Sequence, residues 1–484
     1  MYTLACPSCG APVNFRSAAS VIAVCEYCQS TLLRDADTVK DIGKMSAVLE
    51  DYSPVQIGTS GRFNGDAFTV VGRIQLRYDA GFWNEWYLLF DDGGDGWWSD
   101  ASGQHVITRP IATPPQAPAF AGIFPGYSHA HEGTVFTACD VRSARCVAGE
   151  GELPFRVGEG WVARVADFRA DARFLSFDYS DDAVRLYSGC AVELAELSAQ
   201  LLREPESIAE TAGRLPGSPQ ALDCPSCGSP LAYRAGMATQ LVCAACHAEV
   251  DCAGDKAVVL QKHSELAQKT FTLAPGDTAK IDGADWTLIG LTQKRERDSD
   301  EVTLWVEYLL FNAQRGFLWL IESDTGWERA TVLNRWPKLD AKGRVELLGK
   351  PYRKLYDYGG EVVYAAGAFN WRVRLSDKVA IADYENGGVK LSSEQDANEI
   401  SWTQSRKVAA AEVGRWFGKP ITAKPSAQSA DERTLGGAAK VLSIIYLFIN
   451  LPMVFDSGFM GFVLIAVTLG LIWAPHWFPD LLDS

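Results

Sequence analysis

Eight of the twelve cysteines form two sets that have the spacing of a metal site. In each set, a CxxC pair is separated by fifteen residues from a second CxxC pair. The sets are Cys6, Cys9, Cys25 and Cys28, and then Cys224, Cys227, Cys243 and Cys246, with one offset of 218 positions (224 minus 6, 246 minus 28). Four thiolates satisfy tetrahedral zinc and leave no position for a water nucleophile, so we expect two structural Zn²⁺ ribbons. A rubredoxin-like iron site uses the same ligands and is the alternative.

Acidic residues also recur in both halves of the chain. Glu85 and Glu307 each follow a tryptophan by two positions, Trp83 and Trp305, in segments that are apolar on both faces. Further repeated acids are Asp100/Glu322, Asp167/Asp383 and Asp178/Glu394. A buried carboxylate needs a partner. In a functional site, Glu85 and Glu307 would bind a cationic ligand or act as a general acid or base. In a structural role, they would form an ion pair or a turn cap within the repeat. We favour the structural role, because ion pairs within a fold also perturb carboxylates. Asp100 and Glu322 are expected near strand ends.

The sequence offers no catalytic signature. A Walker loop, a GxSxG elbow, an HExxH pair and a dinucleotide fingerprint are all missing from the 484 residues. We therefore expect a protein that is not an enzyme and has no catalytic residues.

The elements that would position these residues are duplicated. Short aromatic segments joined by glycine-rich turns recur at offsets of 218, 222 and 216, and drifting offsets are typical of loop insertions between tandem copies (290 minus 72, 305 minus 83, 367 minus 151). The fold class is predicted to be mainly β: two small zinc ribbons and two barrel- or sandwich-like domains with short helices. The predicted order is ribbon 1 at 1–34, β-rich domain 1 at 50–202, a linker at 203–221, ribbon 2 at 222–252, β-rich domain 2 at 268–418, a linker at 419–434 and a transmembrane helical hairpin at 435–478.

The carboxy-terminal tail differs in composition from the rest. Residues 435–455 contain one charge, Lys440, and residues 458–478 contain no acid and no lysine. At about 1.5 Å per residue, each segment spans a hydrocarbon layer of about 30 Å. Basic residues before the first span place both termini and the bulk of the chain on the cytosolic side of the inner membrane. A buried helical pair within a soluble oligomer is the alternative.

The charge excludes one class of partner. A net charge of -15 and ribbons with few basic residues argue against nucleic acid, because phosphate binding requires clustered Lys and Arg. Eight cysteines at metal spacing fit a reducing compartment better than a disulfide framework.

The repeated blocks resemble a bacterial family of domains of unknown function, DUF 4178. Its W-x-E-[WY]-x-L, W-L-x-[DE] and G-[ED]-[LF]-P-W patterns are similar to the segments that begin at Trp83, Trp97 and Gly151, and again at Trp305 and Trp319. The resemblance implies tandem copies, each preceded by a zinc ribbon, and a membrane hairpin. It also implies a neighbourhood of phage-shock-type membrane proteins and polyamine-synthesis-like enzymes, but no activity.

We therefore expect a membrane-anchored cytosolic scaffold or sensor that mediates protein–protein interactions in envelope stress or membrane maintenance. Its partners would be the membrane, other proteins such as phage-shock-type membrane proteins, and further copies of the chain in a homo-oligomer. The alternative is a binding site for a polyamine-like small cation, or an unrecognised enzyme, that uses Glu85 and Glu307.

Overall fold

Strands form most of the regular structure in the part of the chain that the computed structural model describes. The described residues are 2–15, 22–25, 27–28, 30–35, 38–44, 53–79, 81–101, 103–114, 116–155, 161–211, 224–229, 240–243, 245–246, 248–251, 258–261, 270–297, 302–312, 315–339, 343–369, 371, 373–421, 443, 463, 467–469 and 473. Within them, the prediction of a mainly β fold is confirmed.

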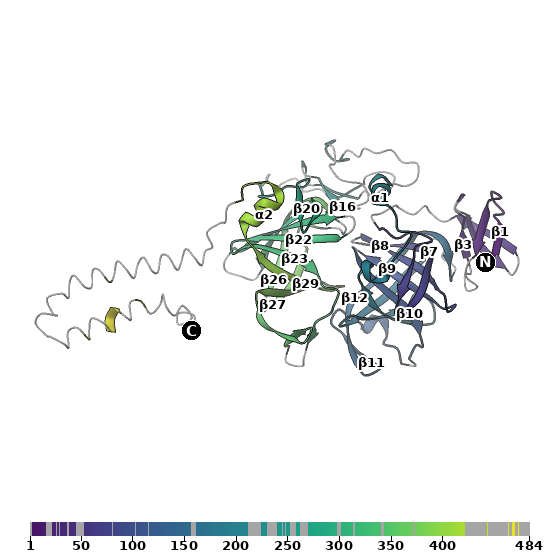
Figure 1. Cartoon of the computed structure of the whole chain (residues 1–484), viewed down its shortest axis with the longest axis horizontal. Coiled ribbons are helices and arrows are strands. Elements are labelled where there is room, and N and C mark those ends of the chain that lie inside the picture. The colour runs from purple at the N-terminus through teal and green to yellow at the C-terminus, as the bar shows by residue number, and fades with distance from the viewer. Residues whose placement is uncertain are drawn as a thin grey trace, which may run out of the picture.

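The first copy of the repeat is a closed barrel of eight antiparallel strands (Figure 1). Around the barrel the strands run β7, β8, β9, β10, β15, β14, β13 and β12, and pairing of β12 with β7 closes it. Their bounds are β7 Asp66–Tyr78, β8 Gly81–Phe90, β9 Asp95–Ala101, β10 Gln104–Ile111, β12 Thr134–Leu153, β13 Val162–Ala170, β14 Arg173–Asp178 and β15 Arg185–Val192. Closure removes the exposed strand edges that a sandwich would keep, so the barrel alternative holds.

The second copy repeats this barrel strand for strand. Its order is β20, β21, β22, β23, β29, β28, β27 and β26, and β26 closes onto β20. The bounds are β20 Ala284–Arg297, β21 Leu304–Asn312, β22 Gly316–Ser323, β23 Gly326–Val332, β26 Lys350–Phe369, β27 Lys378–Asn386, β28 Val389–Gln395 and β29 Ile400–Val408. Shared topology and register establish the tandem duplication in three dimensions.

Each cysteine-containing segment adds strands to its own barrel. Strands β3 (Ile22–Val24), β4 (Ser30–Asp35) and β5 (Thr38–Lys44) extend the sheet from the far end of β12, and β16 (Gln240–Val242), β17 (Glu249–Asp251) and β18 (Val258–Gln261) do so from β26. A separate hairpin pairs β1 (Tyr2–Ala5) with β2 (Pro12–Phe15). The ribbons are therefore continuous with the barrel sheets.

Glycines allow β12 to leave the barrel for the ribbon. Gly151 pairs with Gly72 of β7 on one side and with Val24 of β3 on the other. A Cβ on Gly72 would lie 1.7 Å from the backbone oxygen of Glu152, and Gly151 has a φ of +70°. Only glycine fits so close a crossing of backbones. The same arrangement recurs in the second copy at its counterparts, Gly290 and Gly367.

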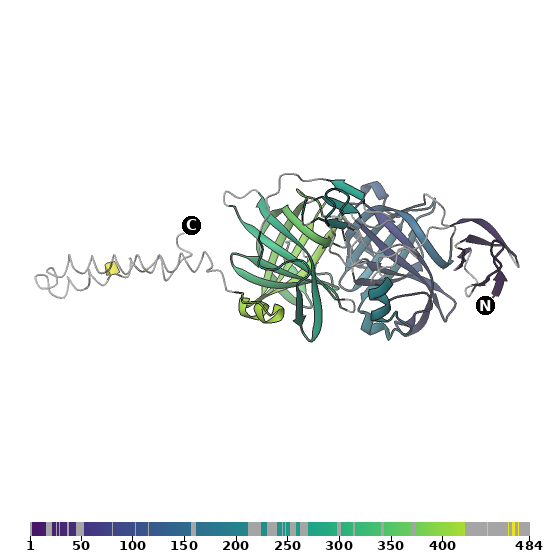
Figure 2. The ribbon, with the colours of Figure 1, turned by 90° about the horizontal axis from the view of Figure 1, so that it is seen from above.

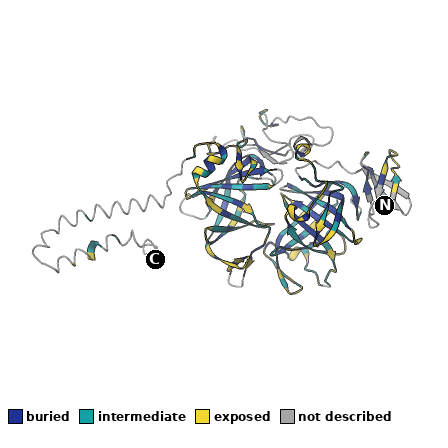
Figure 3. Ribbon diagram, viewed as in Figure 1, coloured by how far each residue is buried: buried dark blue, intermediate teal, exposed yellow. Residues whose placement is uncertain are grey.

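Short elements cover the outer faces. They are β6 (Ser60–Phe63), β11 (Ser128–His131), β19 (Thr278–Ile281), β24 (Lys338–Leu339), β25 (Val345–Leu347), the 3-10 turns η1 (Phe120–Gly122) and η2 (Leu194–Leu197), and the helices α1 (Pro205–Thr211) and α2 (Ala410–Phe417). Large aromatic side chains, Trp86 and Trp98 among them, are completely buried beneath this cover. Buried positions recur along the strands of both barrels (Figure 3). The second copy ends in the helix α2, whereas the first copy ends in the short η2, and α1 lies within the segment 203–221.

The two barrels lie side by side and contact each other directly (Figures 1 and 2). The backbone N–H of Val141 donates to Asn398 O at 2.9 Å, and that of Trp336 donates to Asp171 O at 2.8 Å. Cys139 of the first barrel packs in a hydrophobic cluster of the second that contains Trp336 and Trp402. The barrels thus share a small core at their contact.

The predicted hairpin at 435–478 lies outside the described residues, apart from the six positions given above. Among described residues, the model has no helix of the length and apolarity that a membrane crossing requires.

Candidate functional site

Alternation along the strands identifies the side chains that point into the first barrel. On β13, Val162 and Arg164 are exposed, whereas Ala163 is buried and packs in one cluster with Tyr87 of β8. Strands β8 and β13 are not neighbours in the sheet, so this cluster spans the barrel and marks its interior. Asp167 has the parity of Ala163 and therefore also points inward.

Glu85 lies on this inward face of β8. Its carboxylate accepts hydrogen bonds from Trp83 Nε1 at 2.8 Å and from Ser99 Oγ at 2.7 Å. Burial raises the pKa of Glu85 to about 7; the two hydrogen bonds oppose this shift, and the negative charges of Asp167 and Asp178 add to it. The three repeated carboxylates therefore share one electrostatic environment inside the barrel, although they are distant in sequence.

Asp167 and Asp178 come from neighbouring strands, β13 and β14. Burial raises the pKa of Asp167 to about 6, opposed by a hydrogen bond from Ser176 and by the positive charges of Arg142 and Arg169. Among the described residues, no lysine or arginine forms an ion pair with Glu85 or Asp178. The first barrel thus holds more negative than positive charge in its interior.

This interior is not completely filled by side chains. Several inward-pointing residues keep accessible surface and are only half-buried: Glu85, Ser99, Asp167, Ser176 and Asp178. Within the described part of the chain, three metal-binding side chains approach within 4.8 Å of one another only in the two cysteine quartets. The three carboxylates therefore do not form a compact cluster of metal ligands.

The second barrel contains the same carboxylates together with a lysine. The Nζ of Lys294 lies 2.9 Å from Glu307 Oε1 and 3.2 Å from Glu394 Oε2, and Trp305 Nε1 donates to Glu307 Oε1 at 2.8 Å. Burial lowers the pKa of Lys294, but the charges of Glu307 and Glu394 outweigh it and raise the pKa above its ordinary value. The ammonium group is therefore charged and bridges two of the repeated acids.

A second lysine compensates the remaining acids of this barrel. Lys390 Nζ lies 2.9 Å from Glu328 Oε2 and 3.5 Å from Asp383 Oδ2. The residue of the first copy that corresponds to Lys390 is Phe174. Phe174 pairs across the strands with Arg169, and Lys390 pairs with Glu385; both residues of the second pair lie 216 positions after those of the first (385 minus 169, 390 minus 174). The first barrel therefore has an apolar ring where the second has an ammonium group.

The counterpart of Lys294 in the first barrel is Leu76. Leu76 pairs across the strands with Trp83, and Lys294 pairs in the same way with Trp305. The tryptophan–glutamate hydrogen bond is retained in both copies at 2.8 Å, while the cation between the acids is replaced by a buried leucine. The two barrels thus differ in whether a lysine ammonium group lies beside the tryptophan–glutamate pair.

Asp100 and Glu322 do not belong to this interior cluster. Asp100 lies on the outer face of β9, where Ser53 Oγ donates to its Oδ2 and His105 Nδ1 lies 3.7 Å from its Oδ1. Glu322 accepts hydrogen bonds from Thr272 Oγ1 at 2.9 Å and Tyr308 Oη at 2.7 Å. In each copy this acid holds the segment that precedes the barrel, which is a structural role.

The two cysteine quartets assemble as the sequence predicts, and their geometry is that of a tetrahedral site. Sulfur atoms lie 3.6 Å apart for Cys6 and Cys28 and 3.7 Å apart for Cys9 and Cys25. The corresponding distances in the second quartet, Cys224–Cys246 and Cys227–Cys243, are 3.7 and 3.9 Å. Four thiolates at about 2.3 Å from one zinc ion stand about 3.8 Å apart, so both quartets fit zinc.

In both ribbons a glycine closes the tight turn that follows the first CxxC pair. Gly10 and Gly228 have φ values of +77° and +73°, and each backbone N–H donates to the carbonyl of the first cysteine at 2.8 Å. The ribbons differ in packing. Cys224 and Cys243 share a hydrophobic cluster with Phe311 at one end of the second barrel, whereas the first ribbon has a separate cluster.

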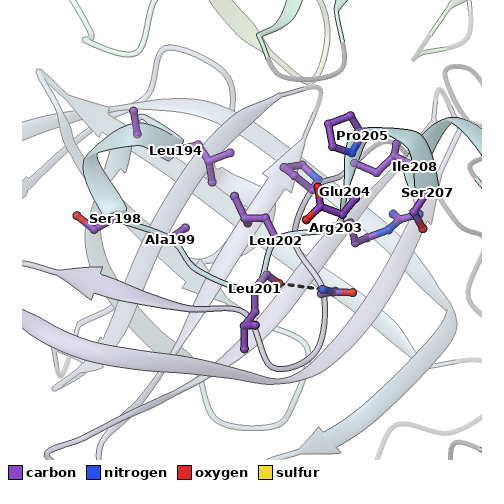
Figure 4. A pocket seen from close by; sticks show the side chains of 13 residues that line it. Leu194, Ser198, Ala199, Leu201, Leu202, Arg203, Glu204, Pro205, Ser207 and Ile208 are labelled. Carbon is purple, nitrogen blue, oxygen red and sulfur yellow. Dashed lines mark hydrogen bonds between the residues drawn. The ribbon is translucent and has the colours of Figure 1, made fainter.

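A surface pocket of about 1160 Å³ lies outside the first barrel, beside η2 and α1 (Figure 4). It is lined mainly by apolar side chains such as Leu194, Leu202 and Ile208, and Gln56 Nε2 donates to Leu201 O at 2.9 Å on its wall. None of the repeated acids lines it. The pocket is therefore separate from the charged interior.

The interpretation of the sequence missed the lysines of the second barrel. Residues that are shared by the two copies include the acids but not the lysines, because Lys294 and Lys390 correspond to apolar residues in the first copy. The useful signal was a difference between the copies: a charged residue in one where the other has leucine or phenylalanine.

Comparison with known proteins agrees with the duplicated architecture. The family described as Domain of unknown function (DUF4178) matches residues 56–194 and 274–410, which together exceed half of the chain and coincide with the two barrels. The curated proteins include no match. The chain therefore belongs to the DUF4178 family and carries two tandem copies of its domain.

Proposed function

We propose that this protein binds a small organic cation, and that the ligand places a primary ammonium group among Glu85, Asp167 and Asp178 of the first barrel. One observation carries the proposal: the second barrel fills the equivalent place with the ammonium group of Lys294, 2.9 Å from Glu307 and 3.2 Å from Glu394. The first barrel retains the acids and lacks the lysine.

The chemistry of the site suits such a ligand. Burial raises the pKa of Glu85 and of Asp167, which means that their charges are poorly solvated, so a cationic partner would stabilise the ionised carboxylates. The indole N–H of Trp83 holds the Glu85 carboxylate in place at 2.8 Å, as Trp305 holds Glu307 in the second barrel.

Calorimetric titration of the full-length protein in mild detergent with propylamine tests this proposal. We expect heat of binding from propylamine at pH 7.5 and none from 1-propanol, which has the same shape without the charge. The variant Leu76→Lys should lose propylamine binding, because its own ammonium group would occupy the site as Lys294 does in the second barrel.

A matched control separates this effect from the general effect of an added charge. Val162→Lys places a lysine on the exposed outer face of the same barrel and should bind propylamine as the wild-type protein does. Equal binding of propylamine and 1-propanol, or unchanged binding in Leu76→Lys, would refute the proposal.

Zinc and a membrane anchor complete the proposed protein. Both quartets have sulfur spacings that fit Zn²⁺, and metal analysis of the purified chain should give two zinc ions, with iron as the competing outcome. Ser443 and Trp473, one from each predicted span, are both helical, and Trp473 Nε1 donates to Ser443 Oγ at 3.0 Å. This contact supports the hairpin at 435–478, and deletion of that segment should release the protein from the inner membrane into the cytosolic fraction.

A second candidate function is the membrane-anchored scaffold. The first ribbon favours this function because it is accessible to a partner. It lies at the end of the molecule away from the second barrel, and its Tyr27 is 74% exposed (Figure 1). Purification in mild detergent followed by mass spectrometry should then recover a stoichiometric protein partner, for example a phage-shock-type membrane protein. A preparation without any partner would leave cation binding as the only candidate.

A further inference from the structure

A positive side chain stands between the interior of the first barrel and the second barrel. Arg142 lies on the inward face of β12, with its Nε 2.5 Å from Asp140 Oδ1. Its Nη2 lies 2.9 Å from the Oε2 of Glu399, which belongs to the turn between β28 and β29 of the second barrel. One guanidinium group therefore joins a carboxylate from each barrel.

Arg142 is connected to Glu85 by a continuous series of contacts. Its Cζ lies 4.2 Å from the centre of the Tyr78 ring, and Tyr78 meets Trp83 edge to face with ring centres 5.7 Å apart. Trp83 Nε1 then donates to Glu85 at 2.8 Å. Movement of the guanidinium group would thus disturb the aromatic wall that orients Glu85.

The field of Arg142 also reaches the acids of the proposed site. Its charge lowers the pKa of Asp167, against the larger effect of burial. The second barrel has Tyr358 at the equivalent position (358 minus 142 equals 383 minus 167), and Tyr358 contacts Trp305 directly with ring centres 5.8 Å apart. The arginine is therefore a feature of the barrel that lacks the internal lysine.

Glu399 is held firmly in place. The carboxylate of Asp396 accepts hydrogen bonds from the backbone N–H groups of Asn398 at 2.7 Å and Glu399 at 2.8 Å. Asn398 O in turn accepts the backbone N–H of Val141 at 2.9 Å. The turn of the second barrel is thus fixed against β12, and Glu399 has a defined position from which to hold Arg142.

We propose that Arg142 is a positioning residue that regulates the ammonium site, and that Glu399 of the second barrel keeps its guanidinium group away from the acids inside the first barrel. This inference rests on the proposed function. Without Glu399, Arg142 turns toward Asp167 and competes with the ligand, as an internal lysine does in the second barrel. Contact between the barrels then determines whether the first barrel accepts a cation.

Titration of full-length variants with propylamine tests the inference. We expect Glu399→Gln to weaken propylamine binding by about tenfold, within the range usual for coupling between sites. Glu399→Asp, which keeps the charge, should restore part of the affinity. Glu346→Gln, which removes an exposed charge of the same barrel that forms no ion pair with Arg142, should bind as the wild-type protein does.

A double-mutant cycle distinguishes competition by Arg142 from a general loss of negative charge. In the Arg142→Gln background no guanidinium group can enter the site, so adding Glu399→Gln should change the affinity by less than about twofold. An equal loss in both backgrounds would overturn the inference.

The two proposals fail in different ways. If wild-type protein binds propylamine, Glu85→Gln abolishes binding and Glu399→Gln leaves it unchanged, the regulatory inference is wrong and the proposed function stands. If the wild-type protein binds no primary amine, both are wrong.

Discussion

Replacement of Lys294 by alanine should destabilise the second barrel and create a site that an added amine can fill. The substitution removes an ammonium group that lies 2.9 Å from Glu307 and 3.2 Å from Glu394. Removal of one partner of a buried ion pair costs about 3–5 kcal/mol, because the remaining charge is left without compensation. The side chain of Glu394 is 29% exposed, and water can solvate part of its charge, so we expect the lower end of this range, about 3 kcal/mol.

Propylamine supplies the atoms that Lys294→Ala removes, three carbons and the ammonium nitrogen. At ten times its dissociation constant, a ligand specific for the folded state stabilises it by about 1.4 kcal/mol. The assay is urea unfolding followed by tryptophan fluorescence, with hydrogen–deuterium exchange of β20 and β21 to assign the transition to the second barrel. Propylamine should raise the midpoint of the second barrel's transition in the variant. In the wild-type protein it should leave that transition unchanged, because the propylamine bound there stabilises the first barrel.

Two comparisons make this prediction refutable. Lys294→Met fills the space of the aliphatic stem without a charge, so it should lose stability and show no rescue by propylamine. 1-Propanol should not rescue Lys294→Ala. A loss below about 1 kcal/mol would show that the buried ion pair is not a major contributor, and equal rescue by 1-propanol would show that the site recognises shape and not charge.

Three further predictions concern other parts of the chain. Burial raises the pKa of Glu85 from 4.5 to about 7, so between these pH values the folded protein binds more protons than the unfolded chain. The ligand-free first barrel should therefore lose stability as the pH rises from 4.5 to about 7. Glu85→Gln should flatten this dependence in thermal unfolding, and an unchanged slope would contradict the assignment. Cys243→Ser should speed hydrogen exchange in the second barrel, because the second ribbon shares a hydrophobic core with that barrel. Cys25→Ser should have little effect on exchange in the first barrel, because the first ribbon has a core of its own. Equal effects of the two variants would disprove this reasoning. Gly72→Ala should cost about 2 kcal/mol in urea unfolding because its Cβ would lie 1.7 Å from a backbone oxygen, while Gly122→Ala, which meets no atom within 4 Å, serves as the control.

The sequence alone determined the features that depend on residue type and spacing. Two CxxC pairs separated by fifteen residues leave few arrangements other than a four-thiolate site, so the quartets at Cys6 and Cys224 could be predicted without a structure. Repetition at nearly constant offsets likewise identified the duplicated β domains and their conserved acids, because two copies of one sequence adopt one fold.

Only the tertiary structure decided which of those acids belong together. Strand closure placed Glu85, Asp167 and Asp178 inside one barrel and Asp100 on its outer face, a distinction that alternation cannot make until the register is known. The pairing of Lys294 with two glutamates brings the β20–β21 hairpin to Glu394 of β28, which is 100 residues further along the chain and approaches Lys294 only when the barrel closes. Similarity between the copies identified the acids that they share. The proposed cation site instead depends on a difference, Lys294 in the second copy and Leu76 in the first. Only the structure shows that this difference lies next to the shared acids.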